Sequence, residues 1–223
     1  MAIPLLEAIP IEGKLITGDA LLTQRRLADY LVLERHAHYH FTVKANQPTL
    51  LEDLQLFFKD RSEPDFIEEP SCDHGRIESR EIWTTAELNQ YLNFPHVGQA
   101  FVIERDVMDK KSGRCSREIA YGVTSHTPDR ADAAAVLAAN RGHWSIENCC
   151  HWIIDWNYDE DRSRISKGYG PENITRLRRF AVGLLKSKGV TNVARKMRQL
   201  ARQVRLVFDY LGMTQNSNQK TPR

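Results

Sequence analysis

Apolar residues that recur at every second position predict β-strands in the first half of the chain. Tyr39, Phe41 and Val43 form one such series, and alternate residues of a strand lie on one face of a sheet. The run Leu15, Ile16 and Thr17 suits a short buried strand. Further strands are expected over residues 77–84, 100–108 and 117–124, with a hairpin turn at 109–113.

Helices are expected between and after these strands, over residues 23–36, 49–59, 131–140, 172–188 and 190–211. Strands and helices in this order predict an α/β fold. The polar stretch 60–70 contains prolines and is expected to be a surface loop, and the polar end of the chain, 212–223, is expected to be disordered. The inner face of the 190–211 helix would be formed by Val193, Met197, Leu200, Val204 and Val207.

Apolar content and cysteine spacing limit the class of protein. No apolar run approaches the roughly eighteen residues of a membrane span, and the first residues lack the pattern of a signal peptide. The four cysteines show no Cys-x-x-Cys spacing. We therefore expect a cytoplasmic protein with reduced cysteines and no membrane partner.

Charge is distributed unevenly along the chain. From Arg162 to the end there are fifteen Lys and Arg residues against two acids, whereas the preceding part has sixteen basic and twenty-seven acidic residues. Such asymmetry predicts a polyanionic partner for the C-terminal part. The alternative is a solvated basic face on surface helices. Arg162 and Arg164 are candidates for phosphate contact.

Four candidate reactive side chains recur at four-residue spacing: His143, Glu147, His151 and Asp155. On one helix they would share a face, which makes Glu147 a candidate metal ligand or general base. The alternative is a buried helix whose polar groups bond locally and whose aromatics, Trp144, Trp152 and Trp156, lie in the core. A zinc ion shared by His143 and His151 is excluded, because eight helical residues span about 12 Å.

Asp19 follows the predicted strand at 15–17 and precedes a predicted helix. An acid at the end of a buried strand is a common ligand position in α/β folds. A helix N-cap or turn is the alternative for this residue.

Together these segments resemble a known family. In chain order they are GKLITGDALLTQ, HYHFTVKANQPTLLED, DHGRIESREIW, RGHWSIENCCHWIIDWNYDEDRSR and PENITRLRRFAVGLLK. They are similar to the transposases of ISAs-type insertion sequences, which include the H-repeat-associated proteins and belong to the DDE superfamily. The resemblance extends from about Ile9 to Leu211, and the run His-Trp-x-Ile-Glu-Asn-x-x-His-Trp is its most specific part.

The resemblance implies an activity and a set of site residues. Asp19 matches the second acid of the Asp-Asp-Glu triad and Glu147 the third, so both are expected to bind Mg²⁺ or Mn²⁺. The activity would be metal-dependent cleavage and transfer of DNA strands at the element ends. The expected DNA-binding residues are Lys44, Asn46, Gln47, Arg141, His143, Asn148, His151, Arg162 and Arg164. Asn46 has the alternative role of a helix cap, and a homodimer or an intact transposase is a further expected partner.

The sequence departs from the family pattern at the first acid. The eighteen residues before Asp19 contain no Asp, so the expected fold is an incomplete ribonuclease H-like sheet without its first three strands. Two-metal phosphoryl transfer needs several carboxylates, which predicts weak metal binding and a truncated, catalytically impaired transposase. The alternatives are a non-catalytic DNA-binding or inhibitory protein and a fragment that fails to fold.

The expected organisation follows from this resemblance. It comprises a ribonuclease H-like part with the second Asp (1–60), a β-rich insertion (61–126), the helix with the catalytic Glu (127–165), basic C-terminal helices (166–211) and the tail (212–223).

Overall fold

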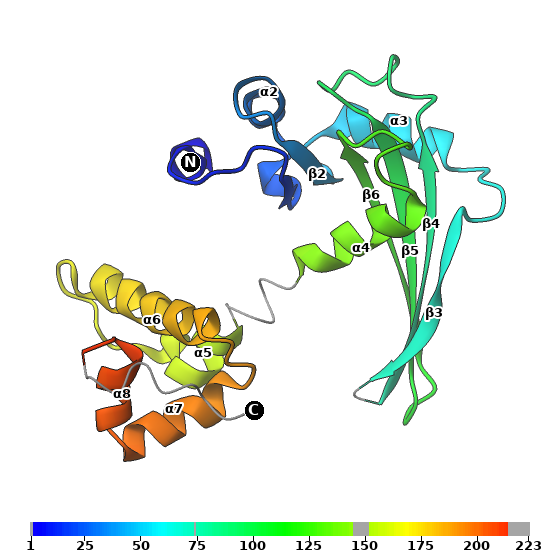
Figure 1. Ribbon diagram of the computed structural model, residues 1–223. Helices are drawn as coiled ribbons and strands as arrows, with labels where there is room; N and C mark the ends of the chain where they lie inside the picture. Colours follow the sequence, from blue (N-terminus) through cyan, green and yellow to red (C-terminus); the bar gives the residue numbers. More distant parts are fainter. Residues whose placement is uncertain (1, 74, 145–151, 214–223) are drawn as a thin grey trace. The chain divides into compact units, whose positions relative to one another are not determined.

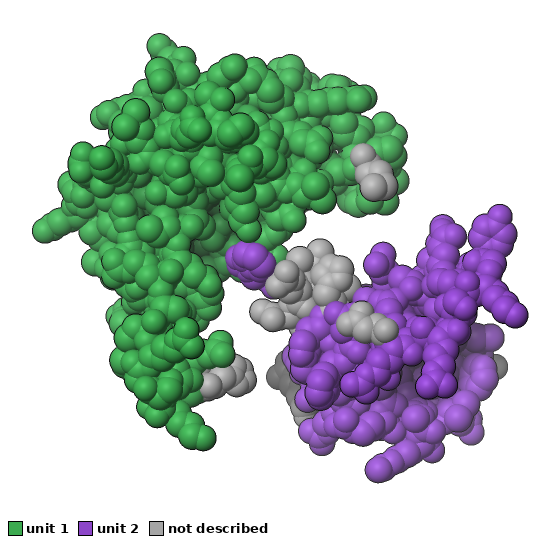
Figure 2. Space-filling view, turned by 180° about the vertical axis from the view of Figure 1, so that it is seen from behind, with its two compact units in different colours: residues 1–143 green, residues 144–223 purple. Residues whose placement is uncertain are grey.

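The computed structural model describes residues 2–73, 75–144 and 152–213. The chain forms two compact units, residues 1–143 and 144–223 (Figure 2). The first is a mixed α/β unit and the second is helical, so the expected α/β class is confirmed. Within the described residues, no helix is long and apolar enough to cross a membrane.

One six-stranded sheet forms the centre of the first unit (Figure 1). Its spatial order is β1-β2-β6-β5-β4-β3; β1 and β2 are parallel, and every other neighbouring pair is antiparallel. The carboxyl ends of β1 and β2 therefore meet at the same edge of the sheet. The strands are β1 (Leu15–Gly18), β2 (His38–Val43), β3 (Phe66–Asp73), β4 (Arg76–Thr85), β5 (Gln99–Asp109) and β6 (Cys115–Thr124).

Helical segments in this unit lie before, between and after the strands. They are α1 (Ala2–Glu7), η1 (Ala20–Leu22), α2 (Arg25–Asp29), the π-helical turn η2 (Tyr30–Glu34), α3 (Pro48–Phe57) and α4 (Ala133–His143). The helix expected over 23–36 is thus present as α2 continued by η2.

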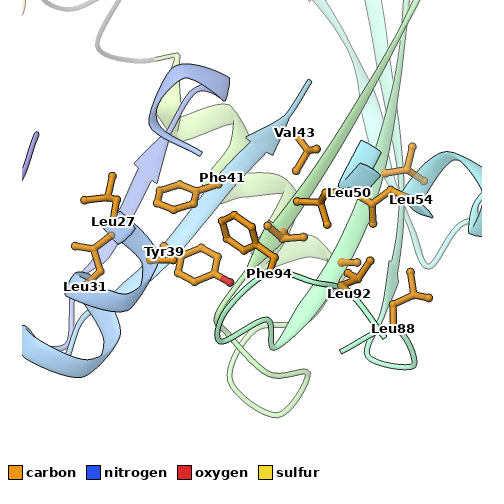
Figure 3. Close-up of a cluster of buried hydrophobic side chains, with 14 of the residues drawn as sticks. Leu27, Leu31, Tyr39, Phe41, Val43, Leu50, Leu54, Leu88, Leu92 and Phe94 are labelled. Atoms are coloured by element: carbon orange, nitrogen blue, oxygen red, sulfur yellow. The ribbon is translucent and has the colours of Figure 1, made fainter. Parts of the chain in front are cut away.

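The larger core lies on the sheet face covered by α2, η2 and α3 (Figure 3). Tyr39, Phe41 and Val43 all point into it, as the two-residue period predicted, and each is almost fully buried. The rings of Tyr39 and Phe41 stack at 4.7 Å between centroids. The Tyr39 hydroxyl donates to the Pro95 carbonyl at 2.7 Å, which satisfies the polar end of this buried ring.

The opposite face of the sheet packs against α4. Val136 and Leu137 of this helix contact a cluster that includes Ile82, Phe101 and Ile103 of β4 and β5. Close packing here requires a glycine in β6, because a Cβ on Gly122 would lie 2.1 Å from Phe101 Cζ. Helices on both faces protect the middle of the sheet from water.

The second unit consists of helices around a small apolar cluster. Ile153, Ile154, Val182, Leu185 and Val193 form its buried centre. The helical segments are α5 (Trp152–Tyr158), η4 (Glu160–Arg162), α6 (Gly170–Ser187), α7 (Val193–Arg202) and α8 (Arg205–Tyr210).

Two predictions about local structure were wrong. Residues 66–70 belong to edge strand β3 rather than to a loop; a break in pairing register between Glu68 and Ser71 accommodates Pro70, and an edge strand tolerates the missing N–H group. The helix expected over 190–211 is interrupted at Gln203, which leaves helical geometry with φ −133° and ψ 75°. Val204 is consequently exposed rather than on the inner face.

Candidate functional site

Asp19 lies directly after β1, at the edge of the sheet where β2 also ends. Its Oδ1 accepts a hydrogen bond from the Leu22 backbone N–H at 3.3 Å and so caps η1. The turn-capping alternative is therefore confirmed. The side chain is exposed, and within the described residues its Oδ2 accepts no hydrogen bond. Capping leaves one carboxylate oxygen available to a cation.

The loop after Asp19 is fastened to the end of β2 by side chains. Thr23 is fully buried, and its Oγ1 lies 2.6 Å from the Thr42 carbonyl oxygen and 3.1 Å from that of Asp19. Asn46 Nδ2 donates to the Ala20 carbonyl at 2.5 Å, and Gln47 Nε2 donates to the Thr23 carbonyl at 2.9 Å. These bonds fix the backbone that positions the Asp19 carboxylate.

The polar residues that follow β2 differ in their contacts. Asn46 does not cap α3, because the N-cap residue is Gln47, whose side chain makes no capping hydrogen bond. The amides of Asn46 and Gln47 instead face the Asp19 loop. Lys44 is exposed beside them, so its ammonium is an accessible positive charge at this edge of the sheet.

The last turn of α4 contacts β1 close to Asp19. His143 Nδ1 lies 3.1 Å from Thr17 Oγ1, two residues before Asp19. One turn earlier, Asn140 Oδ1 lies 3.5 Å from Nε2 of the buried His40. These contacts bring the helix end, four residues before Glu147 in the sequence, to the strand that precedes Asp19.

Three predicted site residues, Glu147, Asn148 and His151, lie outside the described residues. The single helix expected to join His143 to Asp155 also crosses that interval. Asp155 is exposed on α5 in the second unit. Within the described parts of the chain, no three His, Cys, Asp or Glu side chains come together as a metal site.

Arg141 is the first member of an ion-pair network on the face of the sheet that α4 covers. Its guanidinium pairs with Glu68 of β3. Glu68 also accepts from Arg80 of β4 at 3.1 Å, Arg80 pairs with Glu78, and Glu78 pairs with Arg105 of β5. The Arg141 charge is therefore balanced within the protein, whereas Lys44 forms no ion pair with any of the residues that the structure describes.

Histidines near the core are held neutral. Burial lowers the pKa of His40 to about 4, and its ring stacks on Phe101 at 4.6 Å between centroids. Burial is also the main cause of the lowered pKa of His38 and of His126, and the cation of Arg130 lowers both further. These rings add no positive charge near neutral pH.

The second unit presents exposed aromatic and basic side chains. Trp144, Trp152 and Trp156 are 49 %, 54 % and 75 % exposed, so the interpretation of these residues as core aromatics is wrong. The indoles of Trp152 and Trp156 stack on each other at 6.2 Å, as expected for residues four apart on a helix. Arg162 forms a long ion pair with Asp159 at 3.6 Å, and Arg164 is exposed.

Sequence reasoning missed two residues that position this site. Thr17 was assigned to a strand and Thr23 to the start of a helix, which is correct for the first and close for the second. Their bonds to His143 and Thr42 join residues far apart in the sequence. A threonine in a strand or a turn gives no local signal of such partners.

A family model and two curated relatives that this chain matches are all described as transposases. The family model described as "Transposase DDE domain" matches residues 1–205. The chain is 28% identical over 214 residues to "Putative transposase YncI" of Escherichia coli O157:H7, covering 90% of this chain and 53% of that protein. It is 29% identical over 217 residues to "H repeat-associated putative transposase YhhI" of Escherichia coli K12, covering 90% and 55%. The chain thus spans about half the length of these curated relatives.

Proposed function

Because this chain belongs to the family of the transposase DDE domain, we propose that it supplies part of a metal-dependent centre that cuts and joins DNA at the ends of an insertion sequence. The observation that supports this most directly is the position of Asp19. Its exposed carboxylate follows a strand whose next-to-last residue, Thr17, contacts His143 at the end of α4. Asp19 and Glu147 are the proposed metal ligands.

The chemistry of the Asp19 site suits a hard divalent cation. Carboxylate oxygens are preferred ligands of Mg²⁺ and Mn²⁺, and Asp19 Oδ2 accepts no bond from any described residue. A bound cation would supply the positive charge that stabilises the phosphate during strand cleavage. The buried Thr23 and the amides of Asn46 and Gln47 would keep the Asp19 loop in place as the cation binds. Lys44 would contact the DNA backbone beside the carboxylate.

We also propose that a polypeptide of residues 1–223, tested alone, cuts DNA weakly. The family pattern has three acids, and no Asp precedes Asp19 in this sequence. Two carboxylates would leave much of the coordination of two metal ions to water, which lowers affinity. The parallel pair β1–β2, in a sheet with helices on both faces, supports the expectation of a ribonuclease H-like fold.

Metal binding tests the proposed site without depending on turnover. Calorimetric titration of the full chain with Mn²⁺ should give weak binding, and Asp19→Ala or Glu147→Ala should weaken it at least about fivefold, since each removes an anionic ligand. Glu12→Gln is the matched control, because Glu12 is an exposed acid seven residues before Asp19. Unchanged Mn²⁺ affinity in both site variants would refute the ligand assignment.

Cleavage of plasmid DNA with the element ends tests the activity. We expect at most trace nicking by wild type in Mn²⁺, abolished by Asp19→Ala and retained by Glu12→Gln. Nicking that persists in Asp19→Ala would contradict the proposed centre, and rapid nicking by wild type would contradict the proposed impairment.

A further inference from the structure

We infer that the outer face of α7 is a contact surface for the phosphate backbone of duplex DNA. This surface consists of the guanidinium groups of Arg195, Arg198 and Arg202 and is called the α7 arginine face below. The inference rests on the proposed function for its class of partner. It goes beyond the proposed metal centre, because α7 belongs to the helical unit (Figure 1).

Helical periodicity separates this face from the core. Val193 is buried in the apolar cluster of the second unit, and Met197 and Leu200 pack against that cluster. At 100° per residue, the three arginines lie within an arc of about 60° on the opposite side of the helix. All three are exposed. The packing of α7 therefore directs all three arginines to solvent.

The arginines of this face lack acidic partners. Among the described residues, Arg195, Arg198 and Arg202 form no ion pair, although other arginines of the same unit do. Arg176 pairs with Glu172 at 2.5 Å and Arg178 with Glu160 at 3.7 Å. Three like charges on two turns of helix repel one another, so a polyanion that neutralises them would gain binding free energy.

A groove of about 420 Å³ lies along these side chains. It is lined by Arg195, Arg198, Gln199, Arg202 and Gln203. Every lining side chain ends in N–H donors, and none is an acid or an apolar anchor. Protein partners are usually held by buried aromatic or aliphatic anchors, whereas phosphates are held by arginine forks and amide donors.

The length of the α7 arginine face matches a run of phosphates along one strand of duplex DNA. Arg195 and Arg202 are separated by about 10 Å along the helix axis. One strand of duplex DNA presents a phosphate about every 3.4 Å along its axis, so about three phosphates fall within the same length. Lys196 lies about 100° around the helix from Arg195, and its ammonium is 4.9 Å from the centroid of the Tyr210 ring.

Binding of a fluorescein-labelled mixed-sequence DNA duplex of about 30 base pairs, measured by anisotropy across a salt series, tests the inference. The variant Arg195→Gln/Arg198→Gln/Arg202→Gln should bind at least about tenfold more weakly near 100 mM salt. The slope of log affinity against log salt should fall by about 2.7, because each lost phosphate contact contributes about 0.9. The control Arg176→Gln/Arg179→Gln/Lys188→Gln removes three positive charges from the same unit and should lose less than about threefold.

Equal losses in the two triple variants would overturn the inference, since net charge alone would then explain binding. Wild type that binds poly-glutamate but no duplex would overturn it as well. If the glutamine variant melts at a lower temperature than wild type, the variant Arg195→Lys/Arg198→Lys/Arg202→Lys is used to test the inference instead. It keeps the charges and should retain at least half of the wild-type salt slope; a slope as low as that of the glutamine variant would refute the α7 arginine face.

The Mn²⁺ titration and the anisotropy series separate this inference from the proposed function. The titration needs no DNA, and the anisotropy series can be run in EDTA without a divalent metal. Failure of the Mn²⁺ titration with an intact effect of the α7 triple variant would refute the metal centre alone. The opposite result would refute the α7 arginine face alone.

Discussion

The two units of the chain use their arginines in different ways. In the sheet unit, Arg80 and Arg105 are paired with glutamates on neighbouring strands. In the helical unit, Arg195, Arg198 and Arg202 face solvent and, among the described residues, have no acid beside them. Arginines between long antiparallel strands help to hold the strands in register, whereas unpaired arginines on a helix remain available to a partner. The number of basic residues therefore says less about binding than the neighbours of each.

The two units also differ in how tightly glycines are packed. Of the effects predicted here, substitution of one glycine in each unit should give the largest difference in stability. A Cβ on Gly122 in β6 would meet Phe101 Cζ at 2.1 Å and the Phe41 carbonyl oxygen at 2.7 Å. Backbone cannot move aside as a flexible side chain can, so we expect Gly122→Ala to lower the free energy of unfolding by about 3 kcal/mol. Urea denaturation followed by circular dichroism measures this change.

Gly183 in α6 of the helical unit is the matched control, because no heavy atom of the described residues lies within 4 Å of its added Cβ. Gly183→Ala should raise stability by about 0.5–1 kcal/mol through helix propensity. Equal effects of the two substitutions would mean that the sheet unit is packed no more tightly than the helical unit.

A titration of stability against pH gives the next largest effect. Burial lowers the pKa of His40 to about 4 from an ordinary value of 6.5. The unfolded chain therefore binds a proton that the folded chain refuses, and stability should fall as pH decreases from 6.5 toward 4. Between pH 6.5 and pH 5 this loss should be about 2 kcal/mol from His40 alone.

His40→Gln should remove most of that pH dependence, because glutamine does not titrate and can still bond to Asn140. Urea denaturation of both proteins at pH 6.5 and 5 measures the difference. His96→Gln is a suitable comparison variant for the same measurement, since His96 is partly exposed rather than buried and is bonded to Asp29 at 3.0 Å. If His40→Gln and wild type lost equal stability between the two pH values, another group would be responsible.

A structural element could be predicted from the sequence where the residues that determine it are close together in the chain. The strand of Tyr39, Phe41 and Val43 was predicted because its signal, the two-residue period, is local. Strand β3 was missed because an edge strand needs few apolar residues, and its pairing partner is visible only in three dimensions.

Site residues follow the same rule. The position of Asp19 after a strand was evident from neighbouring residues, as was its turn-capping alternative. The bond from Asn46 to Ala20 joins residues twenty-six apart, and the contact of His143 with Thr17 spans one hundred and twenty-six. No periodicity in the sequence encodes such contacts, so the support around Asp19 was not predictable.

The smallest expected effect concerns the ion pair that joins α4 to the sheet. Arg141 is 47 % exposed and pairs with Glu68, which retains Arg80 as a partner when Arg141 is removed. Exposed pairs contribute about 0–1 kcal/mol, so Arg141→Gln should cost less than about 1 kcal/mol. The i,i+4 pair of Arg176 and Glu172 in the helical unit should contribute about 0.3–0.5 kcal/mol. Double-mutant cycles with Glu68→Gln and Glu172→Gln at low and high salt measure both couplings. A coupling above about 2 kcal/mol for Arg141 and Glu68 would mean that charge, rather than the burial of Val136 and Leu137, holds α4 on the sheet.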